Sequence, residues 1–527
     1  MVSPQADSPA PAAPIDNGPS VANIAPASNP PKHHLTTVGR HEKTVIAEAG
    51  LDRRDTGYYS TPPFVADYIG SKLLRLNPAP KTVLDPCVGR GELLRPFLST
   101  DARLCGYDIL HLSDNPFYDF EQRDFIDAIL QRESAPLLAT PLISPDIIVA
   151  NPPYNCHEHS YLRDRKSDIR KHFGPGFALN LYSTFVAAII KFANPGCFIG
   201  LITLDSFLTA RGHETLRRTI TQHCSIHSLL LCPTDLFLNQ GADVRTVILI
   251  LERGARQRER IEVCARPRSS HFFKSLLQDN RFDNSSPDDL VLSSGKDRRE
   301  FLVSVPKSIR ELFANPRLSD KFPCKTGIST GNDGSHLSLG PKEGFATPFY
   351  KNPAGNRFYA KPNAYIRDDF LDASLRIPNF IVRNRRYIGR PGITCSSMGV
   401  SFGAAILPPG CGFGVNANIF PEDAGDTWWL LSYLNSSLCN YIVRGVLLRS
   451  NMITAGYVSR IPLPSLAHGD LHELGELGRQ GYDFSSQERD VLPVVRAIDD
   501  LLFRVCDMPE TDSELVVTFC SDIVRLS

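Results

Sequence analysis

The chain has 527 residues, 42% of them hydrophobic and 22% charged, which predicts two to four soluble domains and excludes a wholly disordered protein. No apolar run approaches the roughly 18 residues of a membrane helix, and no secretion signal opens the chain, so we expect a cytoplasmic protein. The 13 cysteines form no C-x-x-C pair and are odd in number, which indicates reduced thiols rather than a disulfide framework or a zinc site.

The first 40 residues contain eight prolines and seven alanines without a periodic apolar pattern, so we predict a disordered tail. From about Thr56 to Arg253, short apolar runs alternate with helical patterns. The predicted strands cover residues 82–85, 103–108, 146–151, 198–204, 225–232 and 245–251. The predicted helices cover residues 91–98, 125–132, 178–193 and 212–222. Such alternation predicts an α/β domain whose mostly parallel sheet is covered by helices on both faces.

The second half loses this regularity after an arginine-rich stretch at residues 256–268. We therefore expect a tail over residues 1–40, one domain over 41–255 and another over 256–527. Short β-like runs at residues 379–382 and 393–406 and a helical stretch at 427–446 predict that the last of these is a mixed α/β domain.

Basic and acidic side chains are equal in number, 57 each, but they are unevenly distributed. Residues 251–450 carry 28 basic and 19 acidic side chains, whereas residues 451–527 carry 6 and 13. The zero net charge is thus a balance of opposed regions, and residues 251–450 can present a positive face to phosphates. Charge alone favours an ordinary solvated surface over a phosphate-binding face.

Two glycines lie close behind the first predicted strand, where residues 85–94 read D-P-C-V-G-R-G-E-L-L. Gly89 and Gly91 let the backbone turn tightly and let a ligand approach with no Cβ in the way. The segment has no Lys-Ser/Thr of a P-loop, and G-x-G-x-x-G is incomplete. Asp108 ends the second strand, where a carboxylate can accept hydrogen bonds from ribose hydroxyls. Asp124 precedes a helix; each acid alone is more often a helix cap, but several acids at strand ends favour a nucleotide-like ligand.

The tetrapeptide Asn-Pro-Pro-Tyr at residues 151–154 follows the third predicted strand. Two consecutive prolines fix their own backbone and hold the residue before each in extended geometry. The Asn151 side-chain carbonyl and the Pro152 backbone carbonyl then offer two acceptors for one –NH2 group, and Tyr154 adds a flat face for stacking. An isolated Asn-Pro-Pro, by contrast, is usually a turn that closes a strand.

Together these features resemble S-adenosylmethionine-dependent DNA adenine-N6 methyltransferases, and the TaqI-like, gamma-class modification methylases fit the pattern best. The resemblance covers residues 56–253 and implies a Rossmann-like methyltransferase domain followed by a mixed α/β target-recognition domain. Residues 59–66 (Y-S-T-P-P-F-V-A) are similar to the family's first motif, which implies that Tyr59 and Thr61 help hold the methionine end of the cofactor.

The remaining motifs occur in the family's order. Positions similar to the cofactor-binding ones are Asp85, Gly89, Gly91, Asp108, Asp124 and Phe125, although Cys87, Val88 and Arg90 replace the usual small residues. Residues 180–182 and 198–204 resemble the next helix and strand. Phe237, within Asp-Leu-Phe at residues 235–237, resembles the aromatic residue that packs on the flipped base.

The resemblance implies direct methyl transfer to adenine. The N6 lone pair is delocalised into the ring, so hydrogen bonds from N6–H to Asn151 and Pro152 would favour a tetrahedral nitrogen and stabilise the developing positive charge. No strong base is needed, because the methylated ammonium is acidic. The target base must leave the duplex, with Tyr154 and Phe237 as candidate stacking partners.

The resemblance further implies that the second domain recognises double-stranded DNA. Arg383, Arg385, Arg386 and Arg390 form a basic cluster around an aromatic residue, able to contact phosphates and base edges. We expect a bacterial type II modification methylase, acting as a monomer on a short site, protecting host DNA from a separate cognate restriction endonuclease. A palindrome containing TCGA is the site that the resemblance suggests.

Several alternatives share some of these features. Methyltransferases that modify a protein glutamine amide also use Asn-Pro-Pro-Tyr, so the tetrapeptide does not distinguish them, and an RNA substrate also remains open. Cytosine-N4 methyltransferases usually carry Ser or Asp where Asn151 stands, and a catalytically dead DNA-binding module would not need the intact set of acids. The stretch His157-Glu-His159 lacks the H-E-x-x-H spacing, so we expect no metal.

Overall fold

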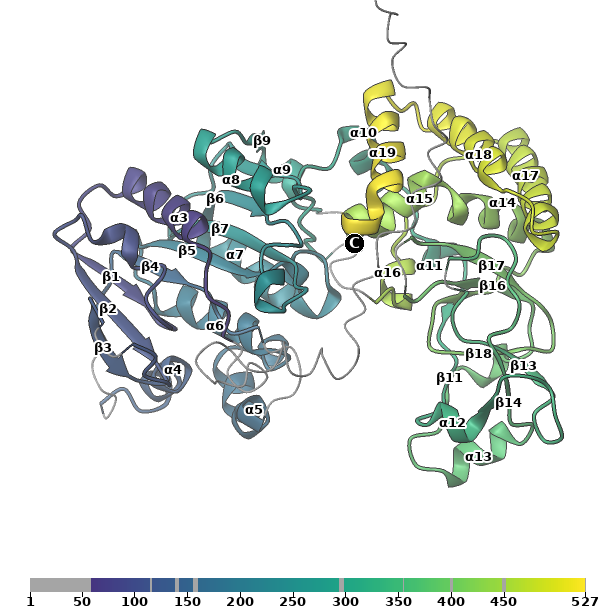
Figure 1. The fold of residues 1–527 in the computed structure, drawn as a ribbon, viewed down its shortest axis with the longest axis horizontal. Coiled ribbons are helices and arrows are strands. Elements are labelled where there is room, and N and C mark those ends of the chain that lie inside the picture. The colour runs from purple at the N-terminus through teal and green to yellow at the C-terminus, as the bar shows by residue number, and fades with distance from the viewer. Residues whose placement is uncertain are drawn as a thin grey trace, which may run out of the picture.

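The computed structural model describes residues 58–113, 116–137, 142–154, 160–292, 298–353, 355–398, 401–447 and 452–526. The predicted tail over residues 1–40 lies outside this part of the chain. The described residues form two lobes that lie side by side, one running from α3 to α9 and the other from α10 to α19 (Figure 1). No helix in the described ranges is long and apolar enough to cross a membrane.

A nine-stranded sheet organises the described part of the first lobe, in the order β3-β2-β1-β4-β5-β7-β6-β8-β9. Its strands are β1 (Thr82–Asp85), β2 (Arg103–Asp108), β3 (Asp119–Gln122), β4 (Ile147–Ala150), β5 (Phe198–Leu204), β6 (Cys224–Leu231), β7 (Thr246–Arg253), β8 (Ile261–Cys264) and β9 (Asp283–Ser285). Strands β1 to β5 are parallel, whereas β7 runs antiparallel to both of its neighbours. The predicted mostly parallel sheet is therefore confirmed.

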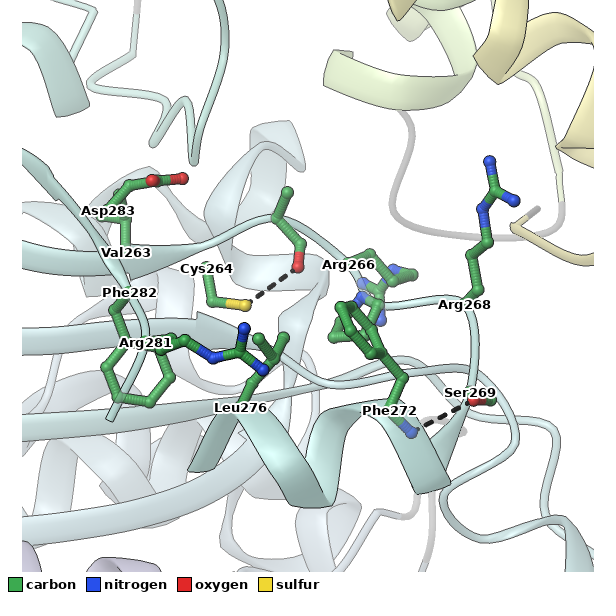
Figure 2. A pocket seen from close by; sticks show the side chains of 12 residues that line it. Val263, Cys264, Arg266, Arg268, Ser269, Phe272, Leu276, Arg281, Phe282 and Asp283 are labelled. Carbon is green, nitrogen blue, oxygen red and sulfur yellow. Dashed lines mark hydrogen bonds between the residues drawn. The ribbon is translucent and has the colours of Figure 1, made fainter. Parts of the chain in front are cut away.

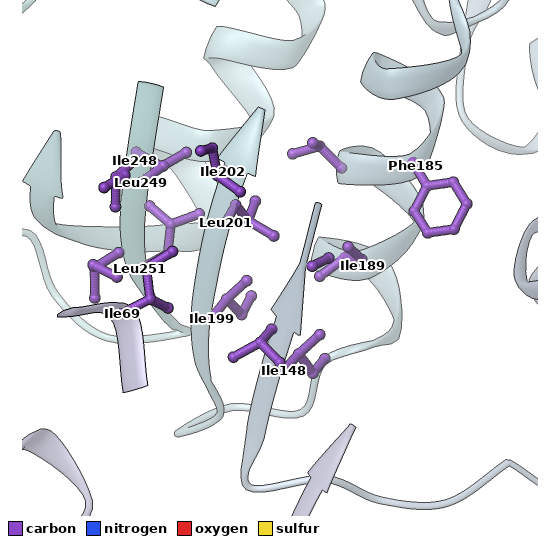
Figure 3. Packing of buried hydrophobic residues seen from close by; sticks show 14 of the residues in the cluster. Ile69, Ile148, Phe185, Ile189, Ile199, Leu201, Ile202, Ile248, Leu249 and Leu251 are labelled. Atoms are coloured by element: carbon purple, nitrogen blue, oxygen red, sulfur yellow. The ribbon is translucent and has the colours of Figure 1, made fainter. Parts of the chain in front are cut away.

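Helices cover both faces of this sheet. They are α3 (Pro63–Leu76), α4 (Phe125–Ser134), α5 (Ser160–His172), α6 (Leu181–Phe192), α7 (Glu214–His223), α8 (Ser270–Asp279) and α9 (Pro287–Leu290). Figure 3 shows Ile69 of α3 against one face of β5 and β7, and Phe185 and Ile189 of α6 on the other side. The central strands β4, β5 and β7 are mostly apolar and almost wholly buried, because both of their faces are covered.

The helix predicted for residues 91–98 is wrong. The structure has turns there and only a short 3-10 helix, Arg95–Phe97. Gly91 adopts a left-handed φ of 80°, which no α-helix tolerates, and Pro96 has no N–H to donate to a helical hydrogen bond. The glycines thus make a loop at the end of β1 and open no helix.

The first sheet continues past the predicted domain boundary at residue 255. Strand β8 pairs in parallel with β6, and β9 pairs with β8. The hydrophobic core of this lobe extends to Val303, whereas Leu302 and Val305 belong to the core of the second lobe. We therefore propose that the boundary lies near residues 302–305, about 50 residues later than the arginine-rich stretch indicated.

The second lobe combines small sheets with a helical layer, in agreement with the predicted mixed α/β composition. Its strands are β10 (Cys324–Lys325), β11 (Ile328–Ser329), β12 (Leu337–Ser338), β13 (Thr347–Tyr350), β14 (Ala364–Ile366), β15 (Ile381–Val382), β16 (Gly392–Cys395), β17 (Ala404–Leu407), β18 (Gly412–Phe413) and β19 (Asn418–Ile419). Its helices are α10 (Lys307–Leu312), α11 (Leu318–Lys321), α12 (Asp333–His336), α13 (Phe370–Arg376), α14 (Ala424–Asn435), α15 (Ser437–Tyr441), α16 (Ala455–Val458), α17 (His468–Ser486), α18 (Leu492–Val505) and α19 (Glu510–Leu526).

Candidate active site

The predicted site residues gather at one edge of the first sheet. Asp85 ends β1, Asp108 ends β2, and Asn151 directly follows β4. Because these strands are parallel, their carboxyl ends meet at the same edge, which is where ligands bind in open α/β sheets. The separate sequence motifs are therefore brought together by the topology of the sheet.

The glycine loop is tied to the second strand by Asp108. Its carboxylate accepts a hydrogen bond from the Gly89 backbone N–H at 2.9 Å and another from Leu110 N–H at 3.1 Å. Gly89 and Gly91 both have left-handed φ angles, 53° and 80°. A Cβ on Gly91 would lie 2.5 Å from the Tyr118 ring, so only glycine fits at this position of the loop.

Two acids, the buried Asp85 and the half-buried Asp108, lie at the ends of β1 and β2. Asp85 accepts a hydrogen bond from the Cys87 backbone N–H at 3.0 Å, and its burial raises its pKa well above the usual value. Burial also raises the pKa of Asp108, although the hydrogen bond from Gly89 lowers it in part. Both carboxylates keep lone pairs beyond these contacts, so the loop retains acceptors that hydroxyl or amino groups of a nucleoside could use.

Asp124 and Phe125 have structural partners of their own. Asp124 caps α4, accepting from the Asp127 backbone N–H at 3.1 Å and from the Tyr161 hydroxyl at 2.9 Å. The Phe125 ring lies in the core, 5.6 Å from the ring of Phe185. The cofactor roles of both residues stay predictions.

The Asn151 side chain is held in one orientation. Its Nδ2 donates to the Tyr59 backbone carbonyl at 2.8 Å and to the Thr61 hydroxyl at 3.0 Å. A carbonyl can only accept, so this contact identifies the nitrogen and places Oδ1 on the opposite side. Oδ1 is buried and has no hydrogen-bond partner among the described residues. A buried acceptor of this kind costs stability unless a ligand satisfies it.

Three aromatic rings pack together beside Asn151. The Tyr59 ring stacks on the Tyr154 ring at 5.5 Å, and Phe237 meets Tyr154 edge-on at 5.8 Å. Phe237 is fully buried, and burial raises the pKa of the Tyr154 hydroxyl well above its usual value. The predicted stacking residues Tyr154 and Phe237 are therefore in contact, and Tyr59 joins them.

Glu92 and Gln240 were missed by the sequence analysis. The Tyr58 and Ser60 hydroxyls both donate to Glu92 Oε1, at 2.7 and 2.6 Å. Gln240 makes two hydrogen bonds to the backbone of Ser60, at 2.9 and 2.7 Å. Glu92 stands inside the glycine motif and could have been noticed there, whereas no local pattern marks a glutamine 180 residues away from its partner.

The arginine cluster predicted in the second lobe is exposed at all four positions, Arg383, Arg385, Arg386 and Arg390. The guanidinium groups of Arg386 and Arg390 lie 4.9 and 5.7 Å from the centre of the Tyr387 ring. The Lys325 ammonium group lies 5.9 Å from the centre of the same ring. This contact was not predicted, because Lys325 is far from Tyr387 in the sequence. Arg385 differs from the others, since it donates to the Ser374 hydroxyl at 2.7 Å.

A pocket of about 950 Å³ opens at the end of β8 (Figure 2). Ser270, beside the lining residue Ser269, donates its backbone N–H to Asp235 at 2.9 Å, in the loop that carries Phe237. Its lining includes Arg266 and Phe272, and Arg268 points outward from its rim. Arg266 pairs with the buried Asp205 after β5 and also donates to the Cys232 carbonyl after β6. Arg266 in the pocket wall therefore connects the loops that follow β5 and β6, at the same edge of the sheet as Asn151. The stretch His157-Glu-His159 lies outside the described residues.

The sheet and the residues at its edge define a Rossmann-like methyltransferase fold. Residues 131–286 match a family model described as N-6 DNA Methylase. The Type II methyltransferase M.BanIII of Aneurinibacillus aneurinilyticus is 28% identical over 246 residues, covering 40% of this chain and 42% of that protein. The chain thus spans less than half the length of this curated relative. The expected resemblance to adenine-N6 DNA methyltransferases is confirmed by these matches; the gamma-class grouping stays a prediction.

Solved structures extend the likeness to the second lobe. A nuclease-deletion mutant of the Type ISP restriction-modification enzyme LlaGI, in complex with a DNA substrate mimic, has a TM-score of 0.53 and 13% identity, covering 81% of this chain and 55% of that one. The DrdV–DNA complex has a TM-score of 0.52 and 10% identity, covering 82% and 58%. At these identities the likeness shows the fold alone.

Proposed function

We propose that this chain transfers a methyl group from S-adenosylmethionine to adenine N6 within a short double-stranded DNA site, as part of a restriction-modification system. The observation that carries the proposal is the buried Oδ1 of Asn151, an acceptor without a partner among the described residues and held beside an aromatic cluster. The N-6 DNA Methylase match over residues 131–286 supports the same chemistry.

The residues at the edge of the sheet fit this cofactor. The glycine loop leaves the backbone open to a ligand, and Asp85, Asp108 and Asp124 offer acceptors at successive strand ends. Tyr59 and Thr61 lie on the same side of the site as Asn151. When bound, S-adenosylmethionine supplies an electrophilic methyl group on a sulfonium centre.

Asn151 and Pro152 would act on the target nitrogen. Each would accept one N6–H hydrogen bond, Asn151 through Oδ1 and Pro152 through its backbone carbonyl. Two acceptors in these positions turn the nitrogen lone pair out of the ring plane and stabilise the positive charge that grows on it. No general base is needed, because the methylated ammonium loses a proton readily to water.

The aromatic cluster would hold the extruded adenine. A base stacked between two rings needs about 7 Å between them, twice a contact distance of about 3.5 Å. The Tyr154 and Phe237 rings are 5.8 Å apart and edge-on, so they must separate or turn when a base enters. Extrusion itself costs a few kcal/mol, which contacts to the rest of the DNA must offset.

The second lobe would supply those contacts. The exposed Arg386 and Arg390 and the half-buried Lys325 around Tyr387 can neutralise phosphates, and bidentate arginines can read guanine edges. The proposal includes a monomeric, gamma-class enzyme, a DNA site that contains TCGA, and a separate cognate endonuclease. All of these rest on the resemblance.

The proposal is tested by long-read sequencing of genomic DNA from cells that express the chain. We expect one short motif to be fully modified at adenine N6. The Asn151→Ala variant should lose methyl transfer by about 100-fold or more while it still binds cofactor. Asn194→Ala, at an exposed position of the same lobe, is the matched control and should modify DNA normally. Unmodified DNA with a soluble, cofactor-binding protein would refute the proposal and point to a protein-amide or RNA substrate.

The arginine cluster makes a separate prediction about DNA affinity. Replacing Arg383 or Arg386 with Gln should weaken binding uniformly across sequences and lower the slope of log K against log salt by about 1 for each phosphate that is no longer neutralised. Arg479→Gln, on α17, is the control because it changes an exposed arginine that also stacks on an aromatic ring. An unchanged slope in the cluster variants would remove these residues from the interface.

A further inference from the structure

Residues 58–61 contact three loops at the carboxyl edge of the sheet. Two hydroxyls of this segment donate to Glu92 in the glycine loop. The backbone of Ser60 pairs with Gln240, three residues beyond Phe237. The third contact is with Asn151. The segment therefore joins the glycine loop, the aromatic cluster and the tetrapeptide.

The contact with Asn151 uses both hydrogens of the amide. Nδ2 has two N–H groups, and these are taken by the Tyr59 carbonyl at 2.8 Å and by the Thr61 hydroxyl at 3.0 Å. Thr61 is only 3% exposed, so water cannot easily replace its hydroxyl. With both hydrogens occupied, a half-turn of the amide would bring Oδ1 against the Tyr59 carbonyl, which can only accept, and electrostatic repulsion disfavours that arrangement.

We propose that Thr61 is a positioning residue for methyl transfer, whose hydroxyl holds the Asn151 amide so that Oδ1 faces the target amino group. This inference rests on the proposed function. It gives Thr61 a different task from the one that the resemblance implies, which is to hold the methionine end of the cofactor. The two tasks separate kinetically, because an amide that is poorly aimed slows the transfer step, whereas removal of a cofactor contact weakens cofactor binding.

The two tasks can be separated with two substitutions at Thr61. Thr61→Val keeps the shape of the side chain but removes the acceptor, and Thr61→Ser keeps the acceptor. The second lobe offers a matched control. Thr394, fully buried in β16, accepts a hydrogen bond from Asn416 Nδ2 at 2.7 Å, so Thr394→Val breaks the same kind of pair far from the site in sequence.

The measurement is the single-turnover rate on DNA at saturating cofactor, together with the cofactor Kd and the thermal transition of each variant. In Thr61→Val we expect a rate at least about tenfold lower, since a buried N–H loses its partner and the amide is freed to turn. The cofactor Kd should stay within about twofold of the wild type. Thr61→Ser should recover the rate to within about threefold, and Thr394→Val should leave it unchanged.

Three results would overturn the inference: a normal rate in Thr61→Val, a weakened cofactor Kd with a normal rate at saturation, or a failure of Thr61→Ser to restore the rate. The second result would return Thr61 to cofactor binding. A wild-type chain that binds cofactor but methylates no DNA would instead refute the proposed function itself. The wild-type measurement therefore tells the two failures apart.

Discussion

At the scale of single residues, His213 is a buried histidine that the structure holds neutral. Asn180 Oδ1 accepts from the Ser183 backbone N–H, so its Nδ2 must be the group that donates to His213 Nε2 at 3.1 Å. Burial, and to a smaller extent the charge of Arg217, lowers the pKa of His213 to about 4. Protonating Nε2 would turn an acceptor into a donor that faces another donor.

This neutral histidine predicts a loss of stability in mild acid. Below pH 6.5 the unfolded chain takes up a proton at this site, whereas the folded chain does so only near pH 4, so the free energy of unfolding falls as the pH drops through this window. Between pH 7 and 5 the loss from His213 should be about 2 kcal/mol. Urea unfolding of the wild type and of His213→Gln at both pH values isolates the contribution of His213 to the free energy of unfolding, because all other titrating groups are shared. Parallel pH profiles would contradict the assignment.

Sequence could predict which residues lie at the carboxyl edge of the sheet but not how they contact one another. Asn151 and the glycine loop follow apolar strands, and a parallel sheet brings such strand ends to one edge whatever the details. The use of Thr61 as a hydrogen-bond acceptor for Asn151 depends on side chains 90 residues apart, and no periodicity encodes it. Phe125 illustrates the same limit, since its motif position predicts a ligand contact and only the structure shows that its ring packs in the core.

At the scale of elements, β9 and α17 were not predicted for the same reason: tertiary contacts override the local preference of their residues for strand or helix. Strand β9 is Asp-Asn-Ser, residues with low strand propensity, and is held by pairing with β8. Helix α17 contains four glycines, which weaken any helical pattern. A Cβ on Gly478 would lie 2.3 Å from the Trp428 carbonyl, so α17 needs this glycine to approach α14. Only the packed structure explains these choices.

The extended sheet predicts where the first lobe can be cut. Strand β6 is buried along its whole length, and a fragment that ends at residue 255 would turn it into an exposed apolar edge. Such a fragment would also lose Glu262, which pairs with Lys72 of α3 at 2.5 Å, and Phe273, which packs against Phe64. We expect a fragment of residues 1–305 to be soluble and to unfold cooperatively, and a fragment of residues 1–255 to aggregate.

Size-exclusion chromatography and calorimetry of the two fragments check this expectation. Equal solubility and equally sharp unfolding transitions would show that β8 and β9 are an addition that the sheet does not need. Failure of both fragments would show that the first lobe requires the second for stability.

At the scale of the whole molecule, the two lobes are joined by a buried ion pair as well as by the chain. Arg460 of the second lobe pairs with Glu300, which is 2% exposed, and donates to the Thr209 carbonyl at 2.8 Å. The Thr209 hydroxyl in turn donates to the Leu447 carbonyl. These contacts lie between the lobe that would carry the reaction and the lobe that would read DNA, so they fix how one is presented to the other.

Breaking this ion pair should therefore loosen the junction. Arg460→Met leaves the Glu300 carboxylate buried with one partner fewer, and we expect a loss of about 3 kcal/mol and two separate calorimetric transitions in place of one. Adding Glu300→Gln should restore part of the loss, because the uncompensated charge is removed. Arg479→Met, at an exposed pair with Glu476, is the control and should cost less than about 1 kcal/mol. If Arg460→Met behaves like this control, the ion pair contributes nothing to the coupling and the apolar contacts at the junction must carry it.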